Sequence, residues 1–220
     1  MTLSIVARDP ATGAFGVATA SASLAVGAIV PHARAGVGAI ATQGYSTNPT
    51  YGPDGLDLLA AGGAAASVIT ALSEADEGRS RRQLVAIDSV GRTAAWTGEG
   101  NVPAMGHLCY EGFAVAGNML AGEGVLAAMA GAYAAAPDGT FTERLLRAIR
   151  AGDRQGGDRR GRQSAALCVF GHERYALVDL RADDADDPIA KLLRLYALSK
   201  DPGFVAFRNR LPTRDTPHRS

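Results

Sequence analysis

The order in which strand-like and helix-like segments follow one another constrains the fold of this chain more than any other feature. Three hairpins are predicted, because apolar and Thr-rich runs flank short turns containing Gly: residues 2–21, 84–96 and 164–180. Single strands are predicted around residues 28–33, 37–43 and 112–119. Because hairpins outnumber strand–helix–strand units, the sheets are expected to be antiparallel.

Helices are predicted between these strands. Within residues 52–76, Leu56, Leu59, Val68, Ile69 and Leu72 recur at helical spacing, and Gly62-Gly63 divides the segment into two helices. Two more helices are predicted at 124–136 and 141–151. A last helix is expected after Asp187, which suits an N-cap, with Pro188 in its first turn.

Two sheets built from hairpins, with helices outside them, predict the α+β class and a four-layer αββα sandwich of two mainly antiparallel sheets. Hydrophobic residues make up 47% of the 220 residues, which suffices for a sizeable core. No internal repeat or linker divides the chain. We therefore expect a single domain over residues 1–210, followed by a flexible C-terminal tail at 211–220.

Composition also excludes several classes of partner. Lys plus Arg and Asp plus Glu are equal at 22 each, so no overall charge draws the chain to nucleic acid or to an anionic membrane. No apolar run reaches the ~18 residues of a membrane span, and no signal-peptide pattern is present. Cys109 and Cys168 lack metal-ligand spacing and are expected to be buried or partly buried free thiols. These features predict a cytoplasmic protein.

The residue behind the initiator methionine has two interpretations. Thr2 is an ordinary strand residue, as at the start of many proteins. Alternatively, because methionine is usually cleaved before a small residue, Thr2 is exposed as a nucleophile. Its own α-amine, with a pKa near about 8, then serves as the base for its hydroxyl. A nearby cation lowers the pKa of that amine, and "VPHARAG" offers Arg34, with His32 as an alternative, at the end of a neighbouring strand.

Other segments offer residues that suit such a site, each with a plain structural alternative. Gly44, just past a predicted strand, is either an oxyanion donor through its N–H or a loop glycine. Asn118 either orients a reacting group or occupies a turn. In "GGDRRGRQSAAL", Asp158 and Ser164 either face an active site or belong to a solvated loop, and Arg159 and Arg160 are candidates for binding an anion.

Metal and cofactor signals are weak. "RADDADDP" lacks the spacing of an EF-hand loop, and Asp187 is already explained as a helix cap. The four histidines show no ligand or triad pattern. We expect no metal and no cofactor.

The segments "TLSIVARDPATGAFGVATASASLAVGAIVPHARAGVGAIATQ", "RQLVAIDSVGRTAAWTG", "AGNMLAG" and "GGDRRGRQSAALCV" together resemble an uncharacterised bacterial family, an N-terminal-nucleophile (Ntn) hydrolase-like domain of unknown function. At greater distance the chain is similar to proteasome β-type subunits. That resemblance implies an N-terminal Thr nucleophile at Thr2, a tuning cation at Arg34, an oxyanion-hole N–H at Gly44, and support from Asp158 and Ser164. The usual acidic residue after the second strand has no counterpart, since Thr19, Ser21 and Ser23 occupy that region.

The leading hypothesis is therefore an amidohydrolase that cleaves a small amide substrate through Thr2 after removal of Met1. Asn118, Asp158 and Ser164 orient the reacting groups, and Arg159 or Arg160 binds a substrate carboxylate. The alternative is a non-catalytic member of the same fold that binds a small metabolite or a protein. A homodimer is expected in either case.

Overall fold

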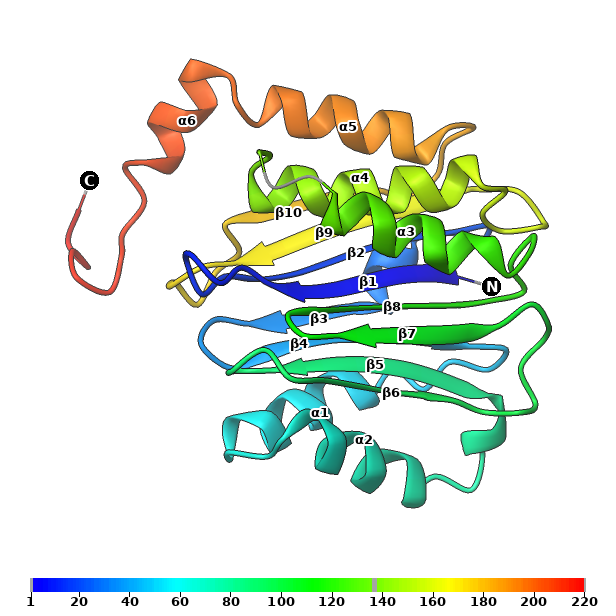
Figure 1. The fold of residues 1–220 in the computed structure, drawn as a ribbon. Helices are drawn as coiled ribbons and strands as arrows, with labels where there is room; N and C mark the ends of the chain where they lie inside the picture. Colours follow the sequence, from blue (N-terminus) through cyan, green and yellow to red (C-terminus); the bar gives the residue numbers. More distant parts are fainter. Residues whose placement is uncertain (1, 136–137, 220) are drawn as a thin grey trace.

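The computed structural model describes residues 2–135 and 138–219, and these form four layers in the order helix, sheet, sheet, helix (Figure 1). The larger sheet has the order β10 (Val178–Ala182), β9 (Ser164–Phe170), β2 (Phe15–Ser21), β1 (Thr2–Arg8), β8 (Phe113–Asn118) and β7 (Gly106–Tyr110). The smaller sheet has the order β3 (Pro31–Arg34), β4 (Gly38–Gly44), β5 (Arg82–Asp88) and β6 (Thr93–Thr97). All neighbouring strands are antiparallel, which confirms the predicted α+β sandwich.

The helices cover the two outer faces. The smaller sheet is covered by α1 (Tyr51–Ala60) and α2 (Ala65–Glu74), and the larger by α3 (Gly124–Ala134), α4 (Phe141–Arg154) and α5 (Pro188–Leu198) (Figure 1). The break at the glycine pair between α1 and α2 is confirmed. Asp187 caps α5 as predicted, because its side chain accepts from the Ala190 N–H. No described helix is long and apolar enough to cross a membrane.

Alternation along the strands builds three apolar layers. On β1, Leu3 and Ile5 pack with the helices on the outer face, whereas Val6 packs between the two sheets. The third layer lies under α1 and α2, where Leu56 and Ile69 pack against Leu84 of β5. Since side chains of a strand point to opposite faces in turn, both faces of β1 are buried, and its sequence is nearly continuous in apolar and small residues.

One strand and one α-helix have no counterpart among the predicted elements, nor do two short 3-10 helices, Val26–Ala28 and Arg79–Arg81. Strand β7 is an edge strand with a mostly exposed pattern, so it lacks the apolar alternation that marks a strand. Helix α6 (Pro202–Arg208) has no buried residue and extends away from the body of the molecule (Figure 1). After it, residues 211–219 return to the turn after β9, where Tyr175 Oη donates to Pro212 O at 3.1 Å. The flexibility of this segment stays a prediction.

Candidate functional site

The space between the two sheets changes from apolar to polar along the strands. At one end, it is filled by residues such as Val6, Val17 and Val85. Toward the start of β1, the same strand faces carry buried polar residues instead: Thr2, Ser4, Thr19, Ser21, Gln43, Gln83, Asn118 and Ser164. Buried polar groups in proteins are nearly always hydrogen-bonded, so eight of them at one end of the sandwich require a network of partners there.

Two glutamine amides connect the sheets at this polar end. Gln43 Nε2 on β4 donates to the Thr2 carbonyl at 3.1 Å and to Gln83 Oε1 at 2.7 Å, and Gln43 Oε1 accepts from Ser4 Oγ at 2.5 Å. Gln83 Nε2 in turn donates to Gly117 O of β8 at 2.9 Å. The start of β1 is therefore fixed to the opposite sheet by side-chain amides.

Thr2 lies in the middle of this arrangement. It pairs with Ser21 on one side and Asn118 on the other, and it is 7% exposed. Thr2 Oγ1 donates to Ser21 Oγ at 3.4 Å, and no described Lys, Arg or His side chain hydrogen-bonds Thr2 Oγ1. Asn118 Nδ2 donates to Gln83 Oε1 at 3.0 Å, whereas its buried Oδ1 has no partner within the described residues. Leaving a buried acceptor unpaired costs stability.

Asp158 holds a loop across the start of β1. Its Oδ2 accepts from the Ala22 N–H at 3.0 Å, one residue past β2, and its backbone bridges to Leu120, two residues past β8. Since β1 lies between β2 and β8, the loop around Asp158 lies beyond the start of β1. Its carboxylate is 2% exposed and forms an ion pair with Arg160 at 3.3 Å. Arg159, on the same loop, is exposed.

Ser164 supports the segment that follows β2. Its Oγ accepts from the Val26 N–H at 3.0 Å and donates to Ser23 O at 2.5 Å. It also pairs with Ser21, the neighbour of Thr2. Ser164 and Asp158 thus both fix the chain beside Thr2, without a hydrogen bond to Thr2 itself.

Two further predicted residues lie on the hairpin of β3 and β4. Gly44 directly follows Gln43 and so lies at the polar end. A side chain at Gly44 would meet Arg81 O at 2.5 Å, and its φ of 141° also favours glycine. Arg34 lies at the other end: it pairs with Gly38 and forms an ion pair with Asp57 of α1 at 2.8 Å. Gly38 and Gln43 are about 17 Å apart on an extended strand, so the structure does not bring Arg34 to Thr2.

Four residues of this site belong to no recognisable sequence motif: Ser4, Thr19, Gln43 and Gln83. Their signal is positional, because each occupies an inward position on a strand whose inward positions further from this end are apolar. Thr19 Oγ1, for example, lies 3.0 Å from Ser4 Oγ, the hydroxyl that donates to Gln43 Oε1, and itself donates to Leu3 O at 3.1 Å. A buried polar residue on an otherwise apolar face is the informative exception.

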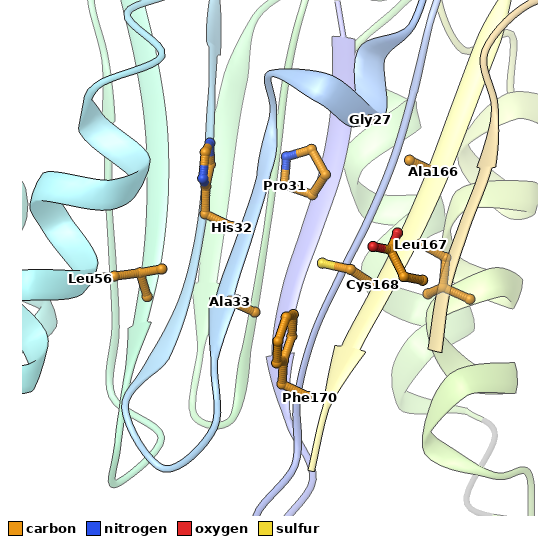
Figure 2. Close-up of a pocket in the computed structure, with 10 residues that line it drawn as sticks. Gly27, Pro31, His32, Ala33, Leu56, Ala166, Leu167, Cys168 and Phe170 are labelled. Carbon is orange, nitrogen blue, oxygen red and sulfur yellow. The ribbon is translucent and has the colours of Figure 1, made fainter. Parts of the chain in front are cut away.

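A separate cavity lies at the side of the sandwich, between β3 and β9 (Figure 2). Its volume is about 220 Å³, and its lining includes His32 and Cys168. Burial raises the pKa of Cys168 to about 12 and lowers the pKa of His32. Both side chains are therefore neutral near pH 7, and Cys168 is a poor nucleophile because only the thiolate reacts readily. Thr2 does not line this cavity.

Both cysteines are free, as predicted, but Cys109 is exposed, because it lies on the edge strand β7, where little of the chain covers it. Within residues 2–135 and 138–219, no group of three or more His, Cys, Asp or Glu side chains is arranged to hold a metal ion.

The fold and the polar end define a four-layer sandwich with a hydroxyl residue at the start of a central strand. A family model described as "Family of unknown function (DUF1028)" matches residues 2–192, and the chain belongs to this family. The crystal structure of protein SPO2555 from Silicibacter pomeroyi, of the same family, is 35% identical, with a TM-score of 0.92 over 99% of this chain and 98% of that chain.

Two proteasome-like structures are more distant. Thiobacillus denitrificans BPH in complex with epoxomicin is 14% identical, with a TM-score of 0.45 over 78% of this chain and 98% of that chain. Anbu, an ancestral β-subunit from Yersinia bercovieri, is 11% identical, with a TM-score of 0.45 over 96% and 98% of the two chains. Likenesses at this distance do not assign an activity. A search of curated proteins gave no match.

Proposed function

We propose that this chain is an N-terminal-nucleophile amidohydrolase that cleaves a small amide substrate through Thr2 after removal of Met1. The observation that carries the proposal is the position of Thr2 at the polar end of the sandwich. There, both neighbouring strands and the opposite sheet present hydroxyl and amide groups to the start of β1. An ordinary first residue of a strand needs no such set of buried polar partners.

The base in this proposal is the α-amine that cleavage would create on Thr2. That amine takes the proton from Thr2 Oγ1 as the oxygen attacks the substrate carbonyl. It then gives the proton to the leaving amine as the C–N bond breaks, which leaves an ester on Thr2. Water, deprotonated by the same amine, attacks the ester and releases the acid, and the proton returns to Thr2 Oγ1.

Neighbouring groups have defined roles in this scheme. The Gly44 N–H is proposed to stabilise the oxyanion, because Gly44 follows the glutamine that binds the Thr2 carbonyl. The unpaired Asn118 Oδ1 would accept a hydrogen bond from the α-ammonium. Asp158 and Ser164 position the surrounding chain. Arg34 takes no part, since it lies at the other end of β4.

The substrate is proposed to carry a carboxylate. Arg159 is exposed on the loop that crosses the start of β1 and is suited to bind this carboxylate, whereas Arg160 already forms an ion pair with Asp158.

We further propose a cytoplasmic location and a homodimer. Neither a nucleic acid nor a membrane is proposed as a partner, because acidic and basic residues are equal at 22 each.

The second candidate is a non-catalytic protein that binds a small metabolite or another protein. Two observations favour it: Thr2 is only 7% exposed, and no described Lys, Arg or His side chain hydrogen-bonds its hydroxyl. In this case, Thr2 is a structural residue of the polar end, and the loop with Arg159 binds the ligand.

Intact-mass spectrometry of the purified protein, followed by reaction with a β-lactone probe, separates the two candidates. The hydrolase is expected to lack Met1 and to gain one probe molecule, mapped to Thr2 by peptide sequencing. Thr2→Ala is expected to abolish labelling. Thr70→Ala, at an exposed position on α2, is the matched control and retains it.

Retention of Met1 on essentially all molecules would overturn the hydrolase. So would full Met1 removal with no labelling of the wild-type protein at any pH between 6 and 9, a range that brackets the usual pKa of an α-amine, about 8. Labelling that persists in Thr2→Ala would assign the reactive group to another residue.

A further inference from the structure

A second cavity lies at the other end of β1 from Thr2. Its volume is about 430 Å³, within the usual range for small-molecule sites. Five separated segments line it: the end of β1, the turns after β5 and β7, the end of α3 and the first turns of α4. Arg8 contributes from β1, Tyr133 from α3 and Arg144 from α4. Arg8 and Thr2 are about 20 Å apart along β1, so the cavity is distinct from the polar end.

Three hydrogen-bond donors of this cavity have no acceptor. Within the described residues, four buried side-chain polar atoms lack a partner, and three of them belong to Arg8 (Nε), Tyr133 (Oη) and Arg144 (Nε). Tyr133 is 2% exposed, so its hydroxyl cannot rely on bulk water. Leaving a buried donor unpaired is costly, and three such donors around one cavity are unusual in a folded protein.

The donors are held in place by packing and not by ion pairs. The guanidinium of Arg144 lies over the Tyr133 ring, 4.4 Å from its centroid, and that ring packs on Phe113 with centroids 4.6 Å apart. Neither Arg8 nor Arg144 forms a salt bridge in the described part of the chain. Burial raises the pKa of Tyr133 to about 12, so its hydroxyl keeps its proton near pH 7.

Among the described residues, no nearby acidic side chain accepts a hydrogen bond from these three donors. Glu111 lines the cavity but is exposed to solvent. Asp9 is close enough to act on the charge of Tyr133, and its Oδ2 accepts from Thr12 Oγ1 at 2.6 Å in the turn after β1. Arg8 Nε, Arg144 Nε and the neutral Tyr133 hydroxyl are therefore left without an acceptor, on three residues that line the same cavity.

We propose that this cavity binds the oxyanion group of a small molecule, a carboxylate or a phosphate, between Arg8, Tyr133 and Arg144. Both groups carry several acceptor oxygens, which suits a cavity to which three different elements each contribute an unpartnered donor. Guanidinium groups pair with such oxygens through charge-assisted hydrogen bonds. The apolar wall formed by Phe113 would contact the rest of the ligand. The proposal does not depend on the chemistry of Thr2.

Isothermal titration calorimetry of the full chain with sodium phosphate and, separately, sodium acetate tests it, at constant ionic strength in chloride buffer. We expect saturable one-site binding of at least one of the two anions. Phosphate bound more tightly than acetate identifies a phosphorylated ligand, and the reverse order identifies a carboxylate.

Three variants test whether the anion binds in this cavity. Arg8→Met and Arg144→Met keep the length of the side chain and remove its charge, and each is expected to weaken binding at least tenfold. Tyr133→Phe keeps the packing on Arg144 and Phe113. It is expected to weaken binding severalfold while raising the Tm of the ligand-free protein, because it removes a buried hydroxyl with no partner. Arg150→Met, at an exposed position on α4, is the control and leaves the affinity unchanged.

Two results would overturn the proposal. One is the absence of saturable binding for both anions, which would mean that water alone fills the cavity. The other is equal weakening in Arg150→Met and Arg144→Met, which would assign the binding to overall charge. Circular dichroism will show whether Arg8→Met and Arg144→Met fold. If either does not, Tyr133→Phe still tests the proposal, because it is expected to raise the Tm and to weaken anion binding; unchanged affinity in Tyr133→Phe would then contradict the proposal.

Discussion

The side chains of Gln43 and Gln83 meet between the two sheets, with Gln43 Nε2 2.7 Å from Gln83 Oε1. Both residues are fully buried, and they come from neighbouring strands of the smaller sheet. Through them, the carbonyl of Thr2 in the larger sheet is connected to β5 of the smaller one. This contact makes the polar end of the sandwich a single hydrogen-bonded unit.

Replacing Gln83 tests how much that unit contributes to stability. Gln83→Leu nearly preserves volume but removes one of the two acceptors of Gln43 Nε2, the acceptor of Asn118 Nδ2, and a donor to Gly117 O. We expect the free energy of unfolding to fall by about 2–4 kcal/mol, because several buried polar groups lose their partners together. Urea denaturation measures it. Gln155→Leu, at the exposed end of α4, is the control, and an equal loss there would refute the interpretation.

The lowered pKa of Asp76 makes the stability of the folded protein depend on pH in the acid range. Hydrogen bonds from Arg82, and further ones from Tyr51, the Gly78 N–H and Asn48, hold the pKa of Asp76 far below its ordinary value. The unfolded chain therefore binds this proton more readily than the folded one. The stabilisation is present above about pH 4 and is lost as the pH falls toward the pKa of the folded state.

Asp76→Asn is thus expected to lower stability at pH 7 and to flatten its dependence on pH between about 2 and 4. Thermal unfolding across that range measures both effects. Glu74→Gln, at an exposed position on α2, serves as the comparison. An unchanged acid dependence in Asp76→Asn would show that other carboxylates control it.

Two helical glycines are expected to respond in opposite directions to alanine. A methyl group on Gly131 of α3 meets nothing within 4 Å, so Gly131→Ala should raise stability by about 0.5–1 kcal/mol through helix propensity. On Gly152 of α4 it meets Met129 Cγ at 2.6 Å and Leu3 Cδ1 at 3.3 Å. Gly152→Ala should therefore cost about 1–3 kcal/mol through overpacking. Differential scanning calorimetry of both variants checks the signs, and stabilisation by Gly152→Ala would contradict this packing.

The two cysteines should differ sharply in their reaction with iodoacetamide. Cys109 is exposed, although its surroundings raise its pKa, so it is expected to react slowly near pH 7 and faster above pH 8.5, the usual pKa of a thiol being about 8.5. Cys168 is buried with a pKa of about 12 and should react only after unfolding. Mass spectrometry with and without urea distinguishes the sites. Labelling of Cys168 in the native protein would show that the cavity beside it opens.

The layered architecture follows from local pattern, which explains why so much of it is predictable. The apolar and Thr-rich runs along 2–8 and 15–21, the glycine pair between α1 and α2, and the cap at Asp187 each act over a few residues. The edge strand β7 could not be predicted in this way, because one edge and much of its surface are exposed and its sequence therefore lacks an apolar pattern.

The site is less predictable, because it depends on how the sheets stack. Asn118, Asp158, Ser164 and Gly44 reach the vicinity of Thr2 through strand register and turns. Arg34 does not, since the hairpin of β3 and β4 places it at the opposite end of the strand from Gln43. The contact of Gln43 with Thr2 joins residues of two sheets, and no short-range sequence signal encodes such a contact.

Strand β1 is bonded along both edges, to β2 and to β8, and covered on both faces. A strand at the start of a chain commonly frays, but here the backbone amides of residues 3–7 are shared between two ladders, so exposing all of them requires both ladders to separate. Their hydrogen–deuterium exchange should therefore proceed only through global unfolding, and its rate should report the stability of the whole molecule. The strand that begins with the candidate nucleophile would then be among the last parts of the protein to exchange.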